Sequence, residues 1–317
     1  MGQVLFEDAT LSRDGKVSCR SCHDPAHAFA DARARSAGVG GQVGTRNAPS
    51  LVGIANDTSF FWDGRRTRLD EAVLDPFTNP VELGLPSTDA VLERLRGEPA
   101  MLAKFRAAFP QAKEVPTLPQ VQQALSAFVR SLNTVVSPFD RAVAESKPLL
   151  GQAEEGRRLF TGSAGCSRCH AIGPAARFTD EQFHHSGIGQ TAIAKRLPSL
   201  THEVIAQQLA ADALGPKLLA DADWSALGRF VVSHKPADIG AFRTPSLRNV
   251  AVTAPYMHDG SIATLSEAVD REIYYHGISG GRPVNLSQAE RESLVAFLEA
   301  LTDDPYEKRM TASSEHR

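Results

Sequence analysis

The 317-residue sequence has no apolar run of the about 20 residues that a membrane-spanning helix requires. It has no excess of charge either, because 34 lysines and arginines face 37 aspartates and glutamates and leave a formal net charge of −3. That balance excludes the strongly basic surface typical of nucleic-acid-binding proteins. Alternating patterns that predict β-strands are also scarce. With an ordinary apolar share of 42%, we expect a globular protein with no membrane span and no nucleic-acid partner.

Cysteine is rare, and all four cysteines fall in two C-x-x-C-H motifs, Cys19–His23 and Cys166–His170. A zinc site would need two cysteine pairs in one compact module, and these pairs lie far apart in the chain. A disulfide exchanger would not need the histidine that follows each pair. The spacing is that of covalent haem attachment, in which both thiols bind the haem vinyls and the histidine binds the iron. The sequence therefore predicts two haem c groups, attached through Cys19, Cys22, Cys166 and Cys169 and ligated by His23 and His170.

The first four residues lack the basic and apolar regions of a signal peptide. Bacteria attach c-type haem outside the cytoplasm. We therefore expect that a leader has been removed and that the mature protein is periplasmic.

Helical patterns fill most of the remaining chain. An apolar stripe over 118–132 predicts an amphipathic helix, and a weaker pattern predicts another over 88–105. A short helix is expected over 154–160, and a capping box, Ser287 with Glu290, precedes a helix over about 288–301. Segments 31–61 and 171–200 are rich in Gly, Pro and polar residues and predict loops, and prolines indicate a linker near 137–151.

These patterns predict an all-α fold of two c-type cytochrome domains, each with one covalent haem and long loops. One motif lies in each half of the chain. We expect an N-terminal haem domain over residues 1–145 and a C-terminal haem domain over residues 146–317.

Several further segments resemble one known family, and they keep that family's order along nearly the whole chain. They are Phe61–Arg65 (FWDGR), Asn79–Glu82 (NPVE), Ser137–Arg141 (SPFDR), Phe242–Asn249 (FRTPSLRN) and Pro255–Gly260 (PYMHDG). The chain is thereby identified as resembling the bacterial di-haem cytochrome c peroxidases, a family that also contains MauG. MauG uses the same architecture to oxidise a protein substrate at a distance.

The resemblance implies a division of labour between the two haems. The N-terminal haem, on His23, would react with H₂O₂, and the C-terminal haem, on His170, would transfer or store electrons. Glu82 matches the family's distal glutamate, the candidate acid and base, although most glutamates lie on protein surfaces. Pro76 matches a proline of the same pocket. Trp62 matches a tryptophan between the haems that carries an oxidising equivalent, although a lone tryptophan is usually a packed core residue.

Two departures from the family pattern concern the first haem. Many members carry a histidine before Arg46–Pro49 that blocks the iron until the other haem is reduced. Residues 31–50 contain no histidine, and Val39 stands at the matching place, so we expect an open first haem in the fully ferric protein. At position 72 the family usually has a glutamine beside Glu82, and this chain has Ala72.

The opposite ligand of the second haem falls, by the resemblance, at Glu272, where ordinary peroxidases have methionine and MauG has tyrosine. Competing candidates are Tyr274, Tyr275, His276 and Met257. A thioether favours Fe(II), whereas a hard, anionic carboxylate favours the higher oxidation states. With Glu272 as ligand, the equivalents of H₂O₂ would be shared by both irons as Fe(IV), coupled through Trp62.

The family also holds a calcium ion between the domains. Its ligands match the side chain of Asn47 and the backbone carbonyls of Thr253 and Pro255, and oxygen ligands of this kind suit Ca²⁺. The alternative is that the segment around Asn47 is a metal-free turn.

Three functions follow in order of preference. The first is a MauG-like di-haem peroxidase that reacts with H₂O₂ and oxidises a protein substrate or draws on a small redox protein. The second is an ordinary di-haem peroxidase supplied with electrons by a small cytochrome or cupredoxin. The third is a non-enzymatic electron carrier, which would need a strong sixth ligand on both irons. The loop before Asn47 offers no histidine or methionine for that purpose. The oligomeric state is left open.

Overall fold

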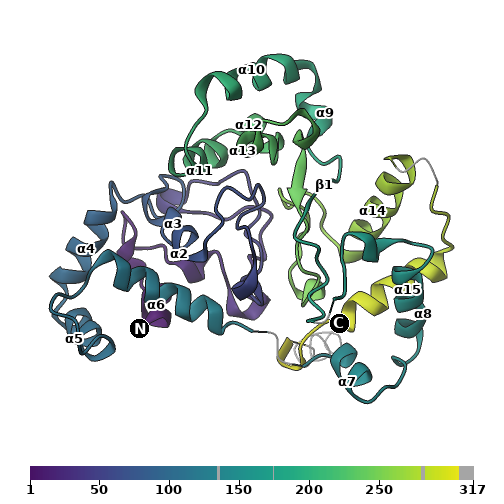
Figure 1. Ribbon diagram of the computed structural model, residues 1–317, viewed down its shortest axis with the longest axis horizontal. Helices are drawn as coiled ribbons and strands as arrows, with labels where there is room; N and C mark the ends of the chain where they lie inside the picture. The colour runs from purple at the N-terminus through teal and green to yellow at the C-terminus, as the bar shows by residue number, and fades with distance from the viewer. Residues whose placement is uncertain (134–135, 174, 280–282, 307–317) are drawn as a thin grey trace.

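The computed structural model describes all residues except 134–135, 174, 280–282 and 307–317. The described chain is built almost entirely from helices and long loops (Figure 1), as predicted. Its strands are β1 (Phe183–His185) and β2 (Ala241–Arg243), which pair antiparallel with Phe183 opposite Arg243. No described helix is long and apolar enough to cross a membrane.

The N-terminal half packs around one apolar core. Its helices are α1 (Gly2–Glu7), α2 (Leu69–Ala72), α3 (Asp75–Thr78), α4 (Thr88–Gly97), α5 (Pro99–Ala108) and α6 (Leu118–Ser131). Side chains of α1, α4, α5 and α6 meet in that core, among them Phe6, Val91, Phe105 and Val121. The segment 31–61 carries only two short 3₁₀ turns, Val39–Gly41 and Ile54–Asn56, so the loop prediction is confirmed there.

Local chemistry explains where these helices begin and end. Thr117 and Gln120 form a reciprocal capping box at the start of α6, and the predicted apolar stripe is buried from Val121 onward. The helix predicted over 88–105 is instead two helices. Pro99 cannot donate a hydrogen bond to the preceding turn, so α4 ends at Gly97 and α5 begins at Pro99.

The C-terminal half has a second core. Its helices are α7 (Pro138–Ala144), α8 (Gln152–Thr161), α14 (Leu265–Ser279) and α15 (Gln288–Glu299), and four phenylalanines meet edge to face between them: Phe139, Phe160, Phe178 and Phe297. Helix α8 lies directly on α15. The lack of a side chain at Gly156 permits this close approach, since a Cβ there would stand 1.8 Å from the carbonyl oxygen of Ser293. The expected linker near 137–151 is wrong in part, because α7 starts there with a capping box of Ser137 and Asp140.

A third, smaller helical lobe lies above the junction of the two halves in Figure 1. It contains α9 (Gln190–Ile193), α10 (Leu197–Gln207), α11 (Ala211–Ala220), α12 (Ala222–Ala226) and α13 (Phe230–Ser233), packed around Trp224. The loop predicted over 171–200 is therefore wrong from residue 190 onward. Thr45 Oγ1 donates to the carbonyl of Leu218 at 2.6 Å and Arg46 Nη2 to that of Ser225 at 2.9 Å, which joins the lobe to the N-terminal half.

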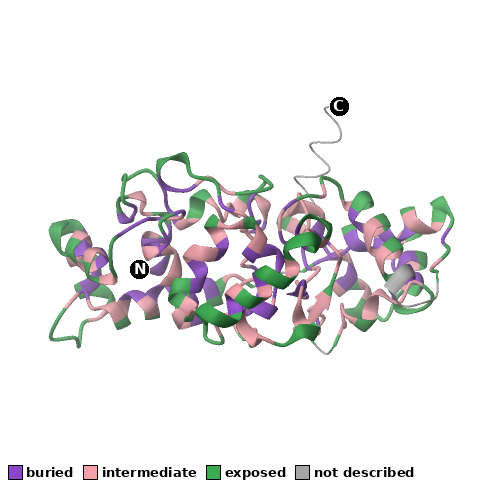
Figure 2. Cartoon of the chain, turned by 90° about the horizontal axis from the view of Figure 1, so that it is seen from above, coloured by how far each residue is buried: buried purple, intermediate pink, exposed green. Residues whose placement is uncertain are grey.

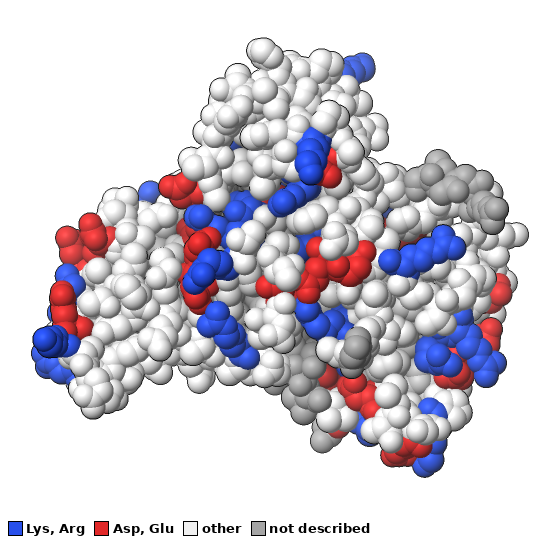
Figure 3. Space-filling model, viewed as in Figure 1, with Lys and Arg blue, Asp and Glu red and all other residues white. Residues whose placement is uncertain are grey.

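Short 3₁₀ helices complete the backbone. They are Ala9–Leu11, Cys19–Ser21, Pro25–His27, Cys166–Arg168, Ala194–Arg196, Pro236–Asp238 and Val250–Val252. Seen from above, buried residues run through the middle of the elongated molecule and exposed residues cover its margins (Figure 2). Figure 3 shows positive and negative side chains interspersed over one face, with no patch of a single sign.

Candidate functional site

The two C-x-x-C-H motifs adopt the same local structure, although they lie about 150 residues apart. Each begins with a single 3₁₀ turn, Cys19–Ser21 or Cys166–Arg168. The backbone N–H of the histidine donates to the carbonyl of the first cysteine at 2.9 Å in both motifs. No disulfide joins the two cysteines of either motif.

Both histidines are oriented by a backbone carbonyl. His23 Nδ1 lies 2.9 Å from the carbonyl oxygen of Phe29, and His170 Nδ1 lies 3.1 Å from that of Phe178. A proton on Nδ1 leaves Nε2 unprotonated and able to bind a metal. Burial lowers the pKa of both histidines, which favours the same neutral, ligating form. The donor set of each turn thus fits a covalent haem c with one axial histidine.

The two acceptor residues share a feature that the sequence patterns did not reveal. Phe29 and Phe178 both occupy the left-handed region, with φ of 57° and 56°. A bulky side chain is uncommon there and costs about 1–3 kcal/mol. The surrounding fold holds both residues in this conformation, and each carbonyl reaches its histidine as a result.

The structure places Glu82 and Pro76 beside the first motif. Glu82 lies in a turn closed by Asn79, whose carbonyl accepts from Glu82 N at 3.0 Å and from Gly84 N at 2.9 Å. The carbonyl of Pro76 accepts from Leu83 N at 3.1 Å, so the proline borders the same turn. Burial raises the pKa of both Cys19 and Cys22, and the charge of Glu82 adds to the rise, so its carboxyl lies near the haem-attachment turn.

The carboxyl of Glu82 is suited to exchanging protons near neutral pH. Burial raises its pKa to about 7, against the opposing charge of Arg65 and with the charge of Asp75 adding to the rise. Arg65 is itself held by Asp63 at 3.0 Å. A group with this pKa populates both its acid and its base form at neutral pH.

Val39, the residue at the place of the family's blocking histidine, packs under the Glu82 turn. It is fully buried, and its N–H donates to the carbonyl of Glu82 at 2.8 Å. The neighbouring Gly38 approaches so closely that a Cβ there would stand 1.7 Å from the carbonyl oxygen of Val81. Ala72, the other departure, is buried at the end of α2. The loop 38–41 therefore supports the Glu82 turn through its backbone.

Trp62 lies at the contact between the two halves. Its indole Nε1 donates to the carbonyl of Asn47 at 2.9 Å, and its own carbonyl accepts from the N–H of Arg243 in β2 at 2.9 Å. Trp62 is only partly buried, whereas Trp224 is 1% exposed in the core of the small lobe. The role of Trp62 in carrying an oxidising equivalent stays a prediction.

Glu272 of α14 lies close to the second motif. Its charge contributes to raising the pKa of Cys166 and Cys169, after burial, and to opposing the fall in the pKa of His170. Glu272 Oε2 lies 3.0 Å from His276 Nε2, one turn further along the helix. Its role as the sixth ligand stays a prediction.

The competing ligand candidates differ in their surroundings. Tyr274 is 62% exposed. The Tyr275 ring packs so closely on the backbone of Gly187 that a Cβ there would meet it at 2.4 Å. His276 is engaged with Glu272, and Met257 adopts a φ of 73° in the turn before Gly260.

The predicted calcium ligands come from segments that the structure joins. Asn47 N donates to the carbonyl of His258 at 2.8 Å, which brings the Asn47 loop against the segment that contains Thr253 and Pro255. The side-chain Nδ2 of Asn47 donates to the carbonyls of Arg33 and Ala34 at 3.2 and 3.3 Å. Calcium at this place stays a prediction.

One other group of ligand-type side chains gathers in the described chain, namely Cys169, Asp180 and His184. His184 Nε2 lies 2.7 Å from Asp180 Oδ2, so these two already form a pair. The sulfur of Cys169 belongs to the second C-x-x-C-H motif, where a haem thioether would occupy it. The group is therefore no independent metal site.

Comparison with known proteins agrees with this geometry. The family model described as di-haem cytochrome c peroxidase matches residues 1–148. The methylamine utilization protein MauG of Methylorubrum extorquens is 34% identical over 316 residues, covering 96% of this chain and 78% of that protein. The cytochrome-c peroxidase IdrP2 of Denitromonas iodatirespirans is 36% identical, with 96% and 81% covered. The cytochrome c551 peroxidase of Pseudomonas aeruginosa is 32% identical, with 95% and 78% covered.

Solved structures give the same result. A MauG-like protein associated with microbial copper homeostasis superposes with a TM-score of 0.76 at 29% identity, covering 96% of this chain and 88% of that one. The di-haem peroxidase BthA of Burkholderia thailandensis shares the fold, with a TM-score of 0.69 at 24% identity and 96% and 86% covered. The predicted resemblance is confirmed. The chain belongs to the di-haem cytochrome c peroxidase family, as a MauG-like peroxidase with two haem c groups.

Proposed function

We propose that the protein reduces H₂O₂ at the haem carried by Cys19–His23, with Glu82 as the acid and base. The two oxidising equivalents are then shared with the haem carried by Cys166–His170 through Trp62. The observation that carries the proposal is the position of Glu82 near the first attachment turn, where backbone hydrogen bonds to Asn79 and Val39 hold it and burial raises the pKa of its carboxyl to about 7.

The haem iron, when bound, supplies the open coordination position and the electrons that break the O–O bond. Overall, H₂O₂ with two electrons and two protons gives two molecules of water. The first water would form when a proton moves from one peroxide oxygen to the other as the O–O bond breaks: the ionised form of Glu82 would accept that proton, and its protonated form would donate it to the leaving oxygen. The second water would form from the remaining oxygen with two protons from solvent and two electrons from the reducing partner. The backbone contacts of Gly38 and Val39 hold the turn that carries Glu82 in place.

Trp62 connects the two halves in this proposal. Its indole is fixed by the carbonyl of Asn47 in the N-terminal half, and its backbone is fixed by Arg243 in the C-terminal half. Both contacts keep the ring at the boundary between the haem-binding segments, where an oxidisable indole shortens the path for electrons.

Glu272 is proposed as the residue that, with His170, would hold the iron of the second haem. Its carboxylate supplies a hard, anionic oxygen, which favours the oxidised states of iron over the reduced state. His276, 3.0 Å away, restricts the orientation of the carboxylate. With this ligand the second haem stores an oxidising equivalent better than it stores a reducing one.

Further parts of the proposal concern location, metal and partners. The division into two haem domains belongs to it, but the boundary expected at residue 145 is moved to before α7, because Phe139 of that helix packs in the C-terminal core. Asn47, Thr253 and Pro255 would hold Ca²⁺ at the junction. The protein acts in the periplasm, and its reducing equivalents come from a small redox protein or from an oxidisable protein substrate.

The first test adds one equivalent of H₂O₂ to the fully ferric protein and records its visible and near-infrared spectra. The proposal expects a prompt and lasting change with a new near-infrared band, because the first haem is open and coupled to the second. A reaction that begins only after one electron is added would indicate an ordinary di-haem peroxidase. No reaction in either state would leave a non-enzymatic electron carrier as the remaining function.

A further inference from the structure

A buried cluster of charged side chains joins the two halves outside the groups used above. The Asp57 side chain is only 3% exposed and forms ion pairs with Arg177 and with Arg243, whose Nη1 lies 2.7 Å from Asp57 Oδ2. Arg177 Nη1 also donates to Glu181 Oε1 at 2.5 Å. Glu181 Oε2 accepts from the N–H and the hydroxyl of Thr58 at 2.7 and 2.8 Å. Two acidic and two basic groups thus link the loop at 57–58 to the C-terminal half.

Each arginine belongs to a segment that makes a hydrogen bond with His170 or with Trp62. Arg177 directly precedes Phe178, whose carbonyl oxygen lies 3.1 Å from His170 Nδ1. Arg243 donates its backbone N–H to the carbonyl of Trp62 at 2.9 Å. The cluster therefore touches both the residue that orients the second axial histidine and the residue proposed to connect the haems.

The carboxylate of Asp57 is the element that holds the cluster together. It is the counter-charge shared by both arginines, and its removal would leave Arg177 with Glu181 alone and Arg243 without an anionic partner among the described residues. The buried Nε of Arg243 has no hydrogen-bond partner among the described residues, so its guanidinium depends on the Asp57 contact for its orientation. Burial raises the pKa of Asp57, and the two arginines oppose that rise.

We infer that Asp57 is a positioning residue for electron exchange between the halves, holding the Trp62 segment against the segments that orient His170. The inference rests on the proposed role of Trp62. Asp57 touches neither substrate nor haem ligand in this role. It acts through Arg177 and Arg243, as groups outside a reactive centre commonly orient those within it.

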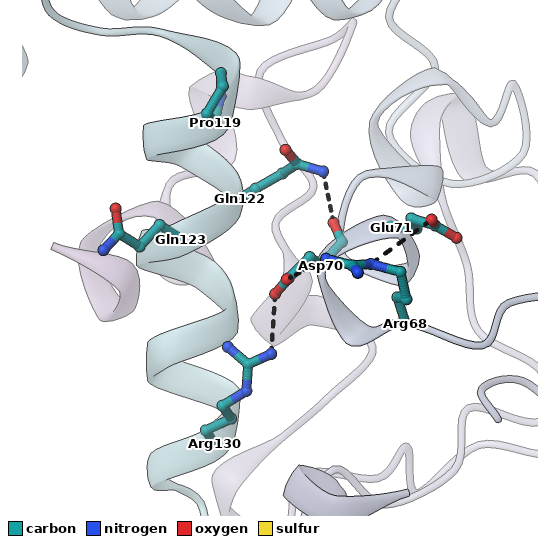
Figure 4. A pocket seen from close by; sticks show the side chains of 7 residues that line it. All are labelled: Arg68, Asp70, Glu71, Pro119, Gln122, Gln123 and Arg130. Atoms are coloured by element: carbon teal, nitrogen blue, oxygen red, sulfur yellow. Dashed lines mark hydrogen bonds and ion pairs between the residues drawn. The ribbon is translucent and has the colours of Figure 1, made fainter. Parts of the chain in front are cut away.

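The variant that tests this is Asp57→Asn, which keeps the size of the side chain and removes its charge. The structure offers a matched control in Asp70→Asn. Asp70 also pairs with two arginines, Arg130 at 3.0 Å and Arg68 at 3.4 Å. Figure 4 shows this group on α2 and α6, beside a surface hollow of about 600 Å³, and all its partners belong to the N-terminal half. The Asp70 side chain is 32% exposed, and neither of these two ion pairs joins the N-terminal half to the C-terminal half.

Two readouts are needed, each on the holoprotein after its haem content has been checked. The first is the near-infrared band formed with one equivalent of H₂O₂, beside the rate at which H₂O₂ is consumed in the first turnover. The second is hydrogen exchange of the backbone amides over 57–62 and 241–243. We expect Asp57→Asn to lose the band while keeping the first-turnover rate, and to exchange faster in both segments. Asp70→Asn should match the wild type in the near-infrared band, in the first-turnover rate and in hydrogen exchange.

Other results overturn the inference. A band of wild-type intensity and lifetime in Asp57→Asn would show that the cluster is structural only, even if the melting temperature falls. An equal loss in Asp70→Asn would also refute the specific role of Asp57. If the wild type itself forms no band, the proposed sharing of equivalents fails. Hydrogen exchange then still decides whether Asp57 joins the two segments.

If Asp57→Asn does not fold, Thr58→Val removes one hydroxyl contact to Glu181 at the exposed edge of the same cluster. A partial loss of the band in that variant supports the inference. An unchanged band together with unchanged hydrogen exchange counts against it.

Discussion

Replacing Glu82 by glutamine removes the one group in the first haem pocket that is proposed to exchange a proton with H₂O₂. Glutamine keeps the shape of the side chain, and the hydrogen bonds that the carbonyl of Asn79 accepts from the N–H groups of Glu82 and Gly84 do not involve that side chain. General acid–base catalysis by a single group contributes about 10²–10⁴-fold to a rate. We therefore expect the second-order rate of H₂O₂ reaction to fall by about that factor, measured by stopped flow on the fully ferric protein.

The pH profile gives a sharper check than the rate at one pH. The pKa of Glu82 is raised to about 7, so two units lower only about 1% of the carboxyl is ionised. If the base form starts the reaction, the wild-type rate falls about tenfold per unit below pH 7. The Glu82→Gln variant should show no such dependence.

The pH dependence of the free energy of unfolding tests the direction of the Glu82 pKa shift independently. A carboxyl whose pKa is higher in the folded than in the unfolded protein binds its proton more tightly when folded. The wild type therefore loses stability as the pH rises from about 4.5 to about 7, by at most about 3 kcal/mol before solvent screening reduces it. The Gln variant lacks this contribution. Denaturant unfolding of both proteins at pH 5 and pH 8 measures the difference.

Glu71→Gln is the matched control, because Glu71 is an exposed carboxylate on α2. It should leave both the rate and its pH profile unchanged. A Glu82→Gln variant within threefold of the wild type, with the same pH profile, would show that another group moves the proton.

Three further predictions follow from the same geometry. Glu272→Met replaces a hard anionic ligand by a thioether, so the reduction potential of the second haem should rise in a spectroelectrochemical titration; an unchanged potential would show that Glu272 is not the ligand. Gly38→Ala places a methyl group 1.7 Å from the carbonyl oxygen of Val81, so it should displace the Glu82 turn and slow H₂O₂ reaction, whereas Gly97→Ala, which meets nothing within 4 Å, should not. Chelation of Ca²⁺ should weaken the near-infrared band, and added Ca²⁺ should restore it in the wild type but not in Asn47→Ala; a band insensitive to chelator would exclude the calcium site.

The sequence predicted those parts of the fold that local chemistry determines. Helices α6 and α15 were predictable because each combines a capping box with an apolar stripe. The break between α4 and α5 follows from Pro99. The weak apolar pattern over 88–105 continues across this proline and therefore predicted a single helix. The small lobe was missed because its helices are short and interrupted, as by Pro216 inside α11. Its stability comes from packing around Trp224, which no local pattern shows.

The candidate site also contains some residues that the sequence predicts and others that only the folded structure brings together. The haem-attachment residues are contiguous in sequence, and each motif could be predicted by itself. The carbonyls of Phe29 and Phe178 could not, because they depend on a left-handed backbone that only the surrounding fold imposes. The Asp57 cluster joins residues up to 186 positions apart, and single-sequence patterns carry no information on such a contact.

The two haem-attachment turns share one local structure, and the proposed function assigns them two kinds of chemistry. Both turns orient their histidine through a carbonyl on Nδ1 at nearly the same distance, 2.9 and 3.1 Å. They differ in the carboxyl that each site adds. Glu82 has no ion-pair partner in the described part of the chain, and burial raises its pKa, which suits proton exchange. Glu272 instead pairs with His276, whose pKa is raised by that contact, which suits a fixed anion. We therefore expect that replacing Glu82 or Glu272 by glutamine impairs different steps, proton transfer in the first variant and the potential of the second haem in the other.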